Sequence, residues 1–171
     1  MREIEFKGIN KQNNQWVYGG YHKHQVITEC PIISTGESFK PTEYAHLIIS
    51  SGFSDWNLPK PIWAYEVYDY SVCQYTEKND KLNKKIFEGD IVFENLYKSY
   101  GVIFFENSSF YIRYDRYDKD GNEKVFNLGY YSSDMLEVVG NIYQDLSLLS
   151  KEYILRNIHY LPKGVESWEI L

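Results

Sequence analysis

Short runs of alternating apolar and polar residues dominate the chain, and they predict a mainly β fold. Near the start, Ile4, Phe6 and Gly8 alternate with charged residues, and residues 16–18 return as an apolar run after a polar cluster. Alternation with a period of two, followed by a turn, is typical of a β-hairpin with one buried face. Further elements are predicted as strands at residues 44–49 and 63–70 and as loops at residues 31–41 and 50–61.

The second half of the chain carries the same pattern more clearly. It contains five short apolar runs joined by tight turns, at residues 91–93, 101–105, 110–117, 123–128 and 136–139. The Asp, Gly and Asn residues of segment 118–122 accept the left-handed backbone that a tight reversal needs. Strands this short, joined by turns this tight, favour a small antiparallel barrel over a parallel sheet.

The pattern becomes helical near the end of the chain. Asp145 is predicted to cap a helix in which Leu146, Leu149 and Tyr153 recur at helical spacing, and the helix is expected to stop near Asn157. The predicted organisation is therefore an N-terminal β region with an inserted loop segment at residues 1–79, a small barrel at residues 80–145, and a short helix with a tail at residues 146–171.

The composition of the chain restricts the expected cellular location and the expected binding partners. The 171 residues are 43% hydrophobic and 25% charged, with a net charge of −6, which is typical of a folded domain. No apolar run reaches the length of a membrane span, and the first residues lack the apolar core of a secretion signal. We therefore expect a cytoplasmic protein with no membrane partner. The acidic balance argues against broad binding to phosphate backbones.

A glycine between two acids, Glu88-Gly89-Asp90, stands directly before the apolar pair Ile91-Val92. Two carboxylates could hold a cation or act as acid and base. They could also fix a tight turn by accepting hydrogen bonds from backbone N–H groups. The structural interpretation is favoured, because a two-carboxylate site needs more converging ligands than the sequence offers.

Histidines and cysteines are the other candidates for chemistry. His22 and His24 would share one face of a strand, where Cys30 or His46 could complete a metal site. Their spacing does not match a metal-ligand pattern, so no metal and no cofactor are predicted. Cys73 needs a nearby histidine and acid to act as a nucleophile, and a buried inert thiol is favoured instead.

One predicted strand interleaves aromatic and basic residues. Alternation places Tyr111, Arg113 and Tyr117 on one face of that strand, and Tyr114 and Arg116 on the other. Aromatic rings next to arginines on a small barrel are what single-strand binders use for stacking. Cross-strand packing on a solvated face would explain the same pattern. These five residues form the candidate surface for a nucleic acid or a protein partner.

Four sequence blocks within residues 2–149 carry a further signal. They are residues 2–7 with 16–19, residues 72–76 (VCQYT), residues 84–92 (KKIFEGDIV) and residues 138–143 (VVGNIY). Their sequences and their order resemble the YopX family of phage and prophage proteins, with its V-G-Q-Y-T-G, K-I-Y-E-G-D-I-V and V-I-G-N-I-Y elements. The residues that match the last two elements are Ile86, Phe87, Glu88, Gly89, Asp90, Ile91, Val92, Gly140, Asn141, Ile142 and Tyr143.

The resemblance has departures and limits. Cys73 and Glu77 stand where the family usually has glycine, and Leu82-Asn83 replaces its usual Asn-Gly turn. Residues 28–62 and the tail after residue 150 have no clear counterpart. The resemblance implies an SH3-like barrel for the second half and a structural role for the matching residues. It implies no activity and no catalytic residue.

These observations together predict a mainly β protein: an N-terminal β-hairpin region, a small SH3-like antiparallel barrel and a short C-terminal helix. The expected function is that of a non-enzymatic binding or assembly module of phage or prophage origin. Exposed sheet edges and abundant tyrosine favour a homo-oligomer, and a phage or host protein is the expected partner. The alternative function is a single-stranded nucleic-acid-binding β-barrel, which the acidic balance disfavours.

Overall fold

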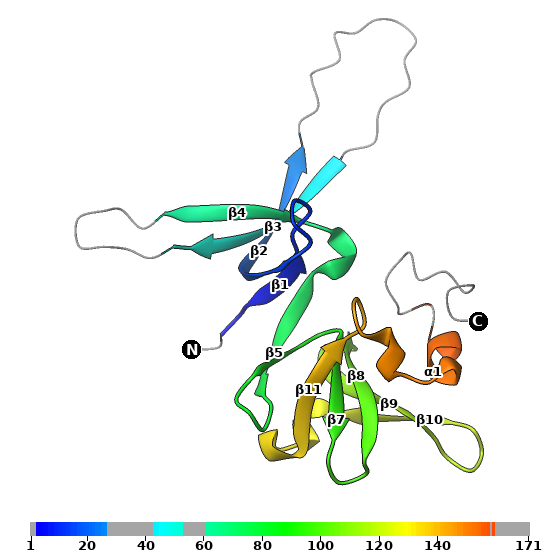
Figure 1. Ribbon diagram of the computed structural model, residues 1–171. Helices are drawn as coiled ribbons and strands as arrows, with labels where there is room; N and C mark the ends of the chain where they lie inside the picture. Colours follow the sequence, from blue (N-terminus) through cyan, green and yellow to red (C-terminus); the bar gives the residue numbers. More distant parts are fainter. Residues whose placement is uncertain (1–2, 27–42, 53–60, 158, 160–171) are drawn as a thin grey trace, which may run out of the picture. The chain divides into compact units, whose positions relative to one another are not determined.

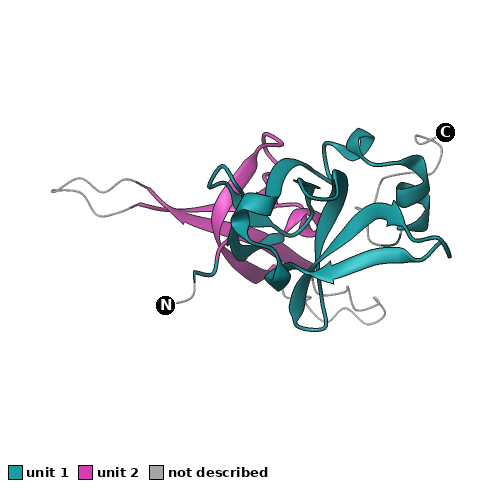
Figure 2. Cartoon of the chain, turned by 90° about the horizontal axis from the view of Figure 1, so that it is seen from below, with its two compact units in different colours: residues 1–4, 73–171 teal, residues 5–72 magenta. Residues whose placement is uncertain are grey.

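The chain forms two compact units, which Figure 2 draws in magenta and teal. The computed structural model describes residues 3–26, 43–52, 61–157 and 159. One unit comprises residues 5–72, and the other comprises residues 1–4 and 73–171. The sequence placed the first boundary after residue 79, whereas the compact units divide after Val72.

Four antiparallel strands make up the sheet of the unit at residues 5–72. They are β1 (Phe6–Ile9), β2 (Trp16–Val26), β3 (Glu43–Ser51) and β4 (Ile62–Val67), in the spatial order β4-β3-β2-β1 (Figure 1). Each strand pairs with its neighbour in sequence. The predicted opening hairpin and the two predicted strands that follow it are therefore confirmed.

A short 3₁₀ turn (Asp69–Ser71) closes this unit against β1. The Ser71 hydroxyl accepts a hydrogen bond from the Ile9 backbone N–H at 2.8 Å. Gly8 lies so close to Val67 that a Cβ there would meet the valine side chain at 3.0 Å. The loop predicted at residues 31–41 and most of the loop predicted at residues 50–61 lie outside the described residues.

The unit at residues 73–171 contains a two-stranded ribbon and a five-stranded antiparallel sheet. The ribbon pairs β5 (Cys73–Asn79) with β6 (Lys85–Phe87), which the sequence did not predict as strands. The sheet has the order β10-β9-β8-β7-β11 (Figure 1), with bounds that follow the five predicted runs: β7 (Asp90–Glu94), β8 (Ser99–Glu106), β9 (Ser109–Tyr117), β10 (Glu123–Asn127) and β11 (Leu136–Asn141).

The edge strands of this sheet, β10 and β11, do not pair with each other in the described part of the chain. The mainly β, antiparallel fold is thus confirmed, and a closed SH3-like barrel stays a prediction.

The five-stranded sheet has an apolar cluster on each face. One cluster gathers side chains such as Ile103, Ile112 and Leu136 with Ile86 of the ribbon, and all four are fully buried. The other cluster joins strand residues to the chain after β11, and its members are Ile91, Val102, Ile142, Leu149, Tyr153 and Ile154. The C-terminal segment therefore covers one face of the sheet.

The C-terminal helix forms, but its start is not where the sequence placed it. A 3₁₀ turn (Leu146–Leu148) comes first, and α1 (Lys151–Arg156) begins after Ser150, whose Oγ accepts the Tyr153 N–H at 3.1 Å. The predicted cap Asp145 was wrong, because its carboxylate instead accepts the Asn141 N–H at 3.0 Å. The predicted end near Asn157 is confirmed. None of the helices within the described residues is long and apolar enough to span a membrane.

Candidate binding pocket on strands β9 and β10

The structure divides the five predicted surface residues between two different environments. Strand β9 presents Tyr111, Arg113 and Tyr117 to the face that the C-terminal segment covers, and Tyr114 and Arg116 to the opposite face. The predicted alternation is therefore confirmed. The five side chains nevertheless do not form one exposed surface, because Arg113 is only 7% exposed and Tyr114 only 2%.

Arg113 is held inside the unit by contacts from three directions. Its Nη1 donates to Asn157 Oδ1 at 2.8 Å, and its Nε lies 3.4 Å from Glu123 Oε2. The guanidinium also lies over the Phe104 ring, 4.3 Å from its centre. A buried arginine paired with a carboxylate and an amide fixes the packing of α1 on the sheet and is not available to a partner.

Tyr111 and Tyr117 pack on the same face as Arg113. Tyr111 stacks on Phe104 with 5.7 Å between ring centres. Tyr117 lies under the guanidinium of Arg156 in α1, at 4.2 Å. For these residues, cross-strand and helix–sheet packing explains the interleaved pattern.

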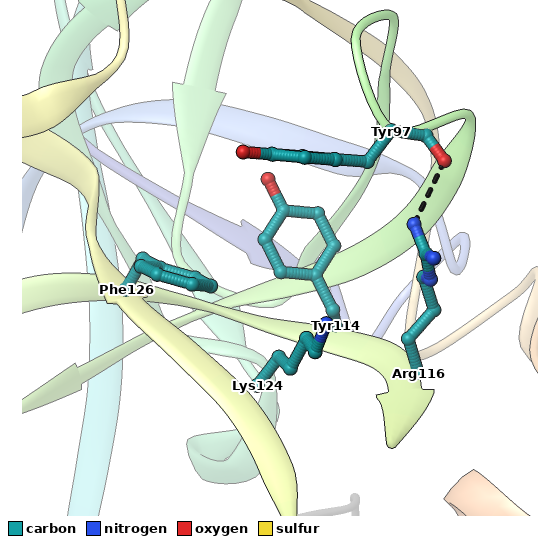
Figure 3. Close-up of a pocket in the computed structure, with 5 residues that line it drawn as sticks. All are labelled: Tyr97, Tyr114, Arg116, Lys124 and Phe126. Carbon is teal, nitrogen blue, oxygen red and sulfur yellow. Dashed lines mark hydrogen bonds between the residues drawn. The ribbon is translucent and has the colours of Figure 1, made fainter. Parts of the chain in front are cut away.

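Tyr114 and Arg116 on the other face belong to a pocket of about 100 Å³. Its remaining walls are Tyr97, from the turn between β7 and β8, and Lys124 and Phe126 from β10 (Figure 3). Tyr97 is 56% exposed and Phe126 44%. The pocket thus combines three aromatic rings with two cationic side chains.

The backbone around the pocket is fixed by specific hydrogen bonds. The buried carboxylate of Glu94 accepts the backbone N–H groups of Leu96 and Tyr97, both at 2.6 Å. Arg116 Nη1 then donates to the Tyr97 carbonyl at 2.9 Å, as the dashed line in Figure 3 marks. A carboxylate that accepts two successive N–H groups holds a turn firmly, so the Tyr97 ring is placed at the rim before any ligand arrives.

Strand β10 supplies the second wall of the pocket. Phe126 pairs with Ile112 across the strands, which places its ring on the pocket face beside Tyr114, with 6.0 Å between the two ring centres. The pairing of β10 with β9 is irregular between Glu123 and Val125. Lys124 stands at this irregularity, and its side chain lines the pocket.

The cationic side chains of the pocket have few internal partners. Among the described residues, no carboxylate forms an ion pair with Arg116 or Lys124. The carboxylate of Asp118 attracts Lys124 but accepts its hydrogen bonds from Asp120 and Asn122. The positive charge of the pocket is therefore largely uncompensated, although the chain as a whole is acidic.

Tyr114 places a polar atom deep in this pocket. Burial raises the pKa of its phenol well above the usual range, and Tyr131 and Glu94 act in the same direction. No hydrogen bond of good geometry is made by this hydroxyl within the described residues. Figure 3 shows the hydroxyl pointing towards the ring of Tyr97. The Tyr131 hydroxyl is close enough to interact with that of Tyr114, so this buried group has a polar neighbour inside the unit.

Sequence reasoning identified Tyr114 and Arg116 but missed the other three residues of the pocket. Tyr97 lies in a turn seventeen residues before Tyr114, and Lys124 and Phe126 lie on the next strand. No local spacing signals this arrangement. The strand register that aligns Phe126 with Ile112 could have suggested Phe126 once the hairpin was predicted.

The carboxylates of Glu88 and Asp90 accept hydrogen bonds from backbone N–H groups. Asp90 Oδ2 accepts the Phe87 N–H at 2.8 Å, which closes their own turn. Burial raises the pKa of the Glu88 carboxyl, while the N–H groups of Gln74 and Phe105 favour its charged form. These contacts support the structural interpretation of both carboxylates.

Three of the four sequence blocks noted above meet at one place in this unit. Gly89 has a φ of +76°, and a Cβ on it would lie 3.0 Å from the Tyr143 ring and 3.6 Å from Cys73 Sγ. Its carbonyl accepts the Ile142 N–H at 2.9 Å, and its N–H donates to the Ile103 carbonyl at 2.8 Å. The central turn, the β5 strand and the segment after β11 therefore converge on this glycine.

The thiol and the histidines do not form a site within the described residues. Cys73 is fully buried, as predicted, with its Sγ 3.5 Å from the Tyr143 hydroxyl. The rings of His22 and His24 lie on one face with 6.0 Å between centres, whereas His46 Nδ1 bonds the Tyr21 hydroxyl at 2.8 Å. Cys30 lies outside the described residues. In the described part of the chain, no three His, Cys, Asp or Glu residues gather as they would around a metal.

Comparison with known proteins places this architecture in a family. No curated protein matches the chain. A family model described as YopX protein matches residues 5–150, which is most of the chain and includes residues of both units. The chain therefore belongs to the YopX family.

Proposed function

We propose that this protein is a non-enzymatic binding or assembly module of phage or prophage origin, and that the pocket on β9 and β10 is its contact site. The observation that carries the proposal is the combination in one pocket of exposed aromatic rings, Tyr97 and Phe126, with the cations Arg116 and Lys124. Exposed aromatic and arginine side chains are the residues that most often dominate binding energy. The proposed scaffold is an SH3-like barrel, and the proposed location is the cytoplasm.

The environments of the residues that could perform catalysis support a binding function over a catalytic one. Glu88 and Asp90 accept backbone hydrogen bonds, and the Cys73 thiol is buried against Tyr143. A nucleophile needs a base within hydrogen-bond reach, and an acid–base pair needs access to a substrate. The pocket residues themselves suit recognition, because cations and aromatic rings orient a ligand without reacting with it.

A homo-oligomer is part of the same proposal. Strand β4 is an edge of its sheet, and it carries Ile62 at 74% exposure and Trp63 at 51%. Strand β10 is an edge of the other sheet, with Val125 at 38% exposure. Exposed apolar edge strands favour pairing with a second copy. Sedimentation velocity should show a species larger than 20.3 kDa, and a monomer at all concentrations would contradict this part.

The pocket is tested by affinity purification from prophage-induced cells. The bait proteins are the wild type, the double variant Arg116→Ala/Lys124→Ala, and a control that loses two positive charges elsewhere, Lys84→Ala/Lys151→Ala. The control residues are exposed and lie outside the pocket. The expected result is a partner that the wild type and the control retain and the pocket variant loses. An identical set of partners for all three baits would overturn the assignment of the pocket as the contact site.

A further inference from the structure

We infer that the pocket on β9 and β10 binds a nucleotide unit of a single-stranded nucleic acid. This inference rests on the proposed binding function and specifies its ligand. Two features of the pocket carry it: the paired cations and the exposed aromatic walls.

The cations supply contacts for a phosphate. Arg116 already donates one hydrogen bond to the Tyr97 carbonyl, which orients its guanidinium at the rim and leaves further N–H donors for a ligand. Lys124 lies on the neighbouring strand and lines the same pocket. Two cations on adjacent strands suit the dense negative charge of a nucleic-acid backbone.

The aromatic walls supply stacking for a base. Tyr97 and Phe126 line the pocket from different elements, and about half of each side chain is exposed. Proteins that bind single strands place bases on such exposed rings, and stacking does not depend on base identity. Base faces are occupied by neighbours in a duplex, so a pocket of this kind favours single strands.

The buried Tyr114 hydroxyl does not select the ligand. The residue is 2% exposed, and its hydroxyl interacts with the Tyr131 side chain inside the unit. Phosphate contacts and stacking therefore carry the inference, and a peptide probe tests the alternative occupant.

The small number of cations predicts a weak dependence on salt. If Arg116 and Lys124 are the two phosphate contacts, the slope of log K against log salt for a single strand is about −1.4, because each contact contributes about −0.7. Raising salt from about 50 to about 200 mM then weakens binding only about sevenfold. Binding carried by general electrostatics would be much steeper, and the net charge of −6 also opposes it.

The experiment measures fluorescence anisotropy of labelled probes at several salt concentrations. The probes are a twelve-nucleotide DNA strand, the same sequence as RNA, its DNA duplex, an abasic strand of equal length, and an acidic peptide with a tyrosine anchor. The wild type should bind the single strands at least tenfold more tightly than the duplex or the abasic strand. This difference follows because only unpaired bases can stack on Tyr97 and Phe126.

Variants separate the contributions. Phe126→Ala should weaken single-strand binding about tenfold, as expected for one lost stacking contact. Arg116→Ala/Lys124→Ala should flatten the salt dependence, and the charge-matched Lys84→Ala/Lys151→Ala should behave like the wild type.

The possible outcomes distinguish this inference from the proposed function. Binding of the peptide but not of the oligonucleotides, with loss in the pocket variants, would overturn the nucleotide inference and support the binding module. Equal oligonucleotide binding by the wild type and by all variants would overturn the pocket as the nucleotide site. If neither probe binds and the purified partners do not depend on the pocket, both proposals fail.

Discussion

Two non-glycine residues of the ribbon adopt the left-handed backbone conformation that favours glycine. Glu77 has a φ of +65° and Asn83 a φ of +63°. Glu77 stands where the family usually has glycine, and Asn83 stands in place of the glycine of the usual Asn-Gly turn. Asparagine tolerates this conformation, but glutamate does so only at a cost in free energy. The pairing of β5 with β6 is irregular between Tyr75 and Asn79, so the strain at Glu77 coincides with a bulge.

Replacing Glu77 therefore tests a backbone effect at a single residue. Glu77→Gly should be more stable than Glu77→Ala by about 1 kcal/mol, because both remove the carboxylate but only glycine relieves the left-handed conformation. Chemical denaturation of the two variants measures the difference in free energy of unfolding. Equal stability would show that the conformation carries no strain.

Asp80 is the residue that fastens the ribbon to the five-stranded sheet. Its Oδ1 accepts the N–H groups of Leu82 and Lys84 at 2.8 and 2.9 Å, and its Oδ2 accepts the Val138 N–H at 2.9 Å. Burial opposes the charged form of the carboxyl, but these three hydrogen bonds outweigh it and hold the pKa of Asp80 below its ordinary value. The ionised carboxylate is therefore the form that stabilises the fold.

The sign of the pKa shift of Asp80 fixes a pH dependence. A lowered pKa in the folded state gives stability that is present above about pH 4 and is lost as pH falls through the folded pKa. Asp80→Asn should destabilise the protein by about 2–3 kcal/mol at pH 7, and the difference should shrink at acid pH. Asp118→Asn is the matched control, because Asp118 makes similar bonds in an exposed turn. A pH-independent effect of Asp80→Asn would contradict the assignment.

At the scale of elements, the short helix α1 acts as a cover for one face of the five-stranded sheet. Tyr153 and Ile154 pack on Ile91 and Val102, and Asn157 at the end of the helix bonds the buried Arg113. Ser150 connects the start of the helix to the sheet, because its backbone N–H and its hydroxyl both donate to Asp115 while its Oγ also caps α1. A helix of six residues is not stable alone, so these contacts hold it.

Removing the Ser150 cap should weaken the packing of α1 on the five-stranded sheet. Ser150→Ala is expected to lower the free energy of unfolding by about 1 kcal/mol or more, since it removes both the cap and the hydrogen bond to Asp115. Ser147→Ala, in the exposed 3₁₀ turn just before, should change stability little. Thermal unfolding followed by circular dichroism compares the two variants, and equal melting temperatures would show that the cap does not contribute.

At the scale of the whole molecule, each apolar cluster of the sheet draws its members from one compact unit. The cluster around Ile103 and Ile112 and the cluster around Tyr153 consist of residues between 86 and 154. A unit with its own core on both faces of a sheet has the means to fold by itself. The matched family region nevertheless includes residues of both units.

This arrangement predicts that residues 73–171 fold when expressed alone. The fragment should unfold in a cooperative transition and show dispersed amide signals in a two-dimensional NMR spectrum, because none of the described side chains in its two clusters comes from residues 5–72. A fragment that is soluble but lacks both properties would show that the units depend on each other.

Much of the fold could be predicted because its signals are local. The runs that became β7 to β11 have the right residue types and clear turns between them, and segment 118–122 turns as its Asp and Gly indicate, with Gly121 at a φ of +81°. Strands β5 and β6 were missed because the period of two breaks at Glu77 and the flanking residues are polar. The position of α1 was misjudged because Asp145 had a stronger partner in Asn141.

The sequence by itself determined the β-rich class, the strands of the five-stranded sheet and the family. It also determined which side chains of β9 share a face. It could not determine which face of β9 the C-terminal segment would bury. The alternation of side chains along a strand is a local property, whereas burial of one face depends on how distant segments pack. Only the tertiary structure buried Arg113 under α1 and brought Tyr97 and Phe126 to Tyr114 and Arg116. The pocket exists because a turn and a neighbouring strand meet β9, and that meeting has no signature in the spacing of residues along the chain.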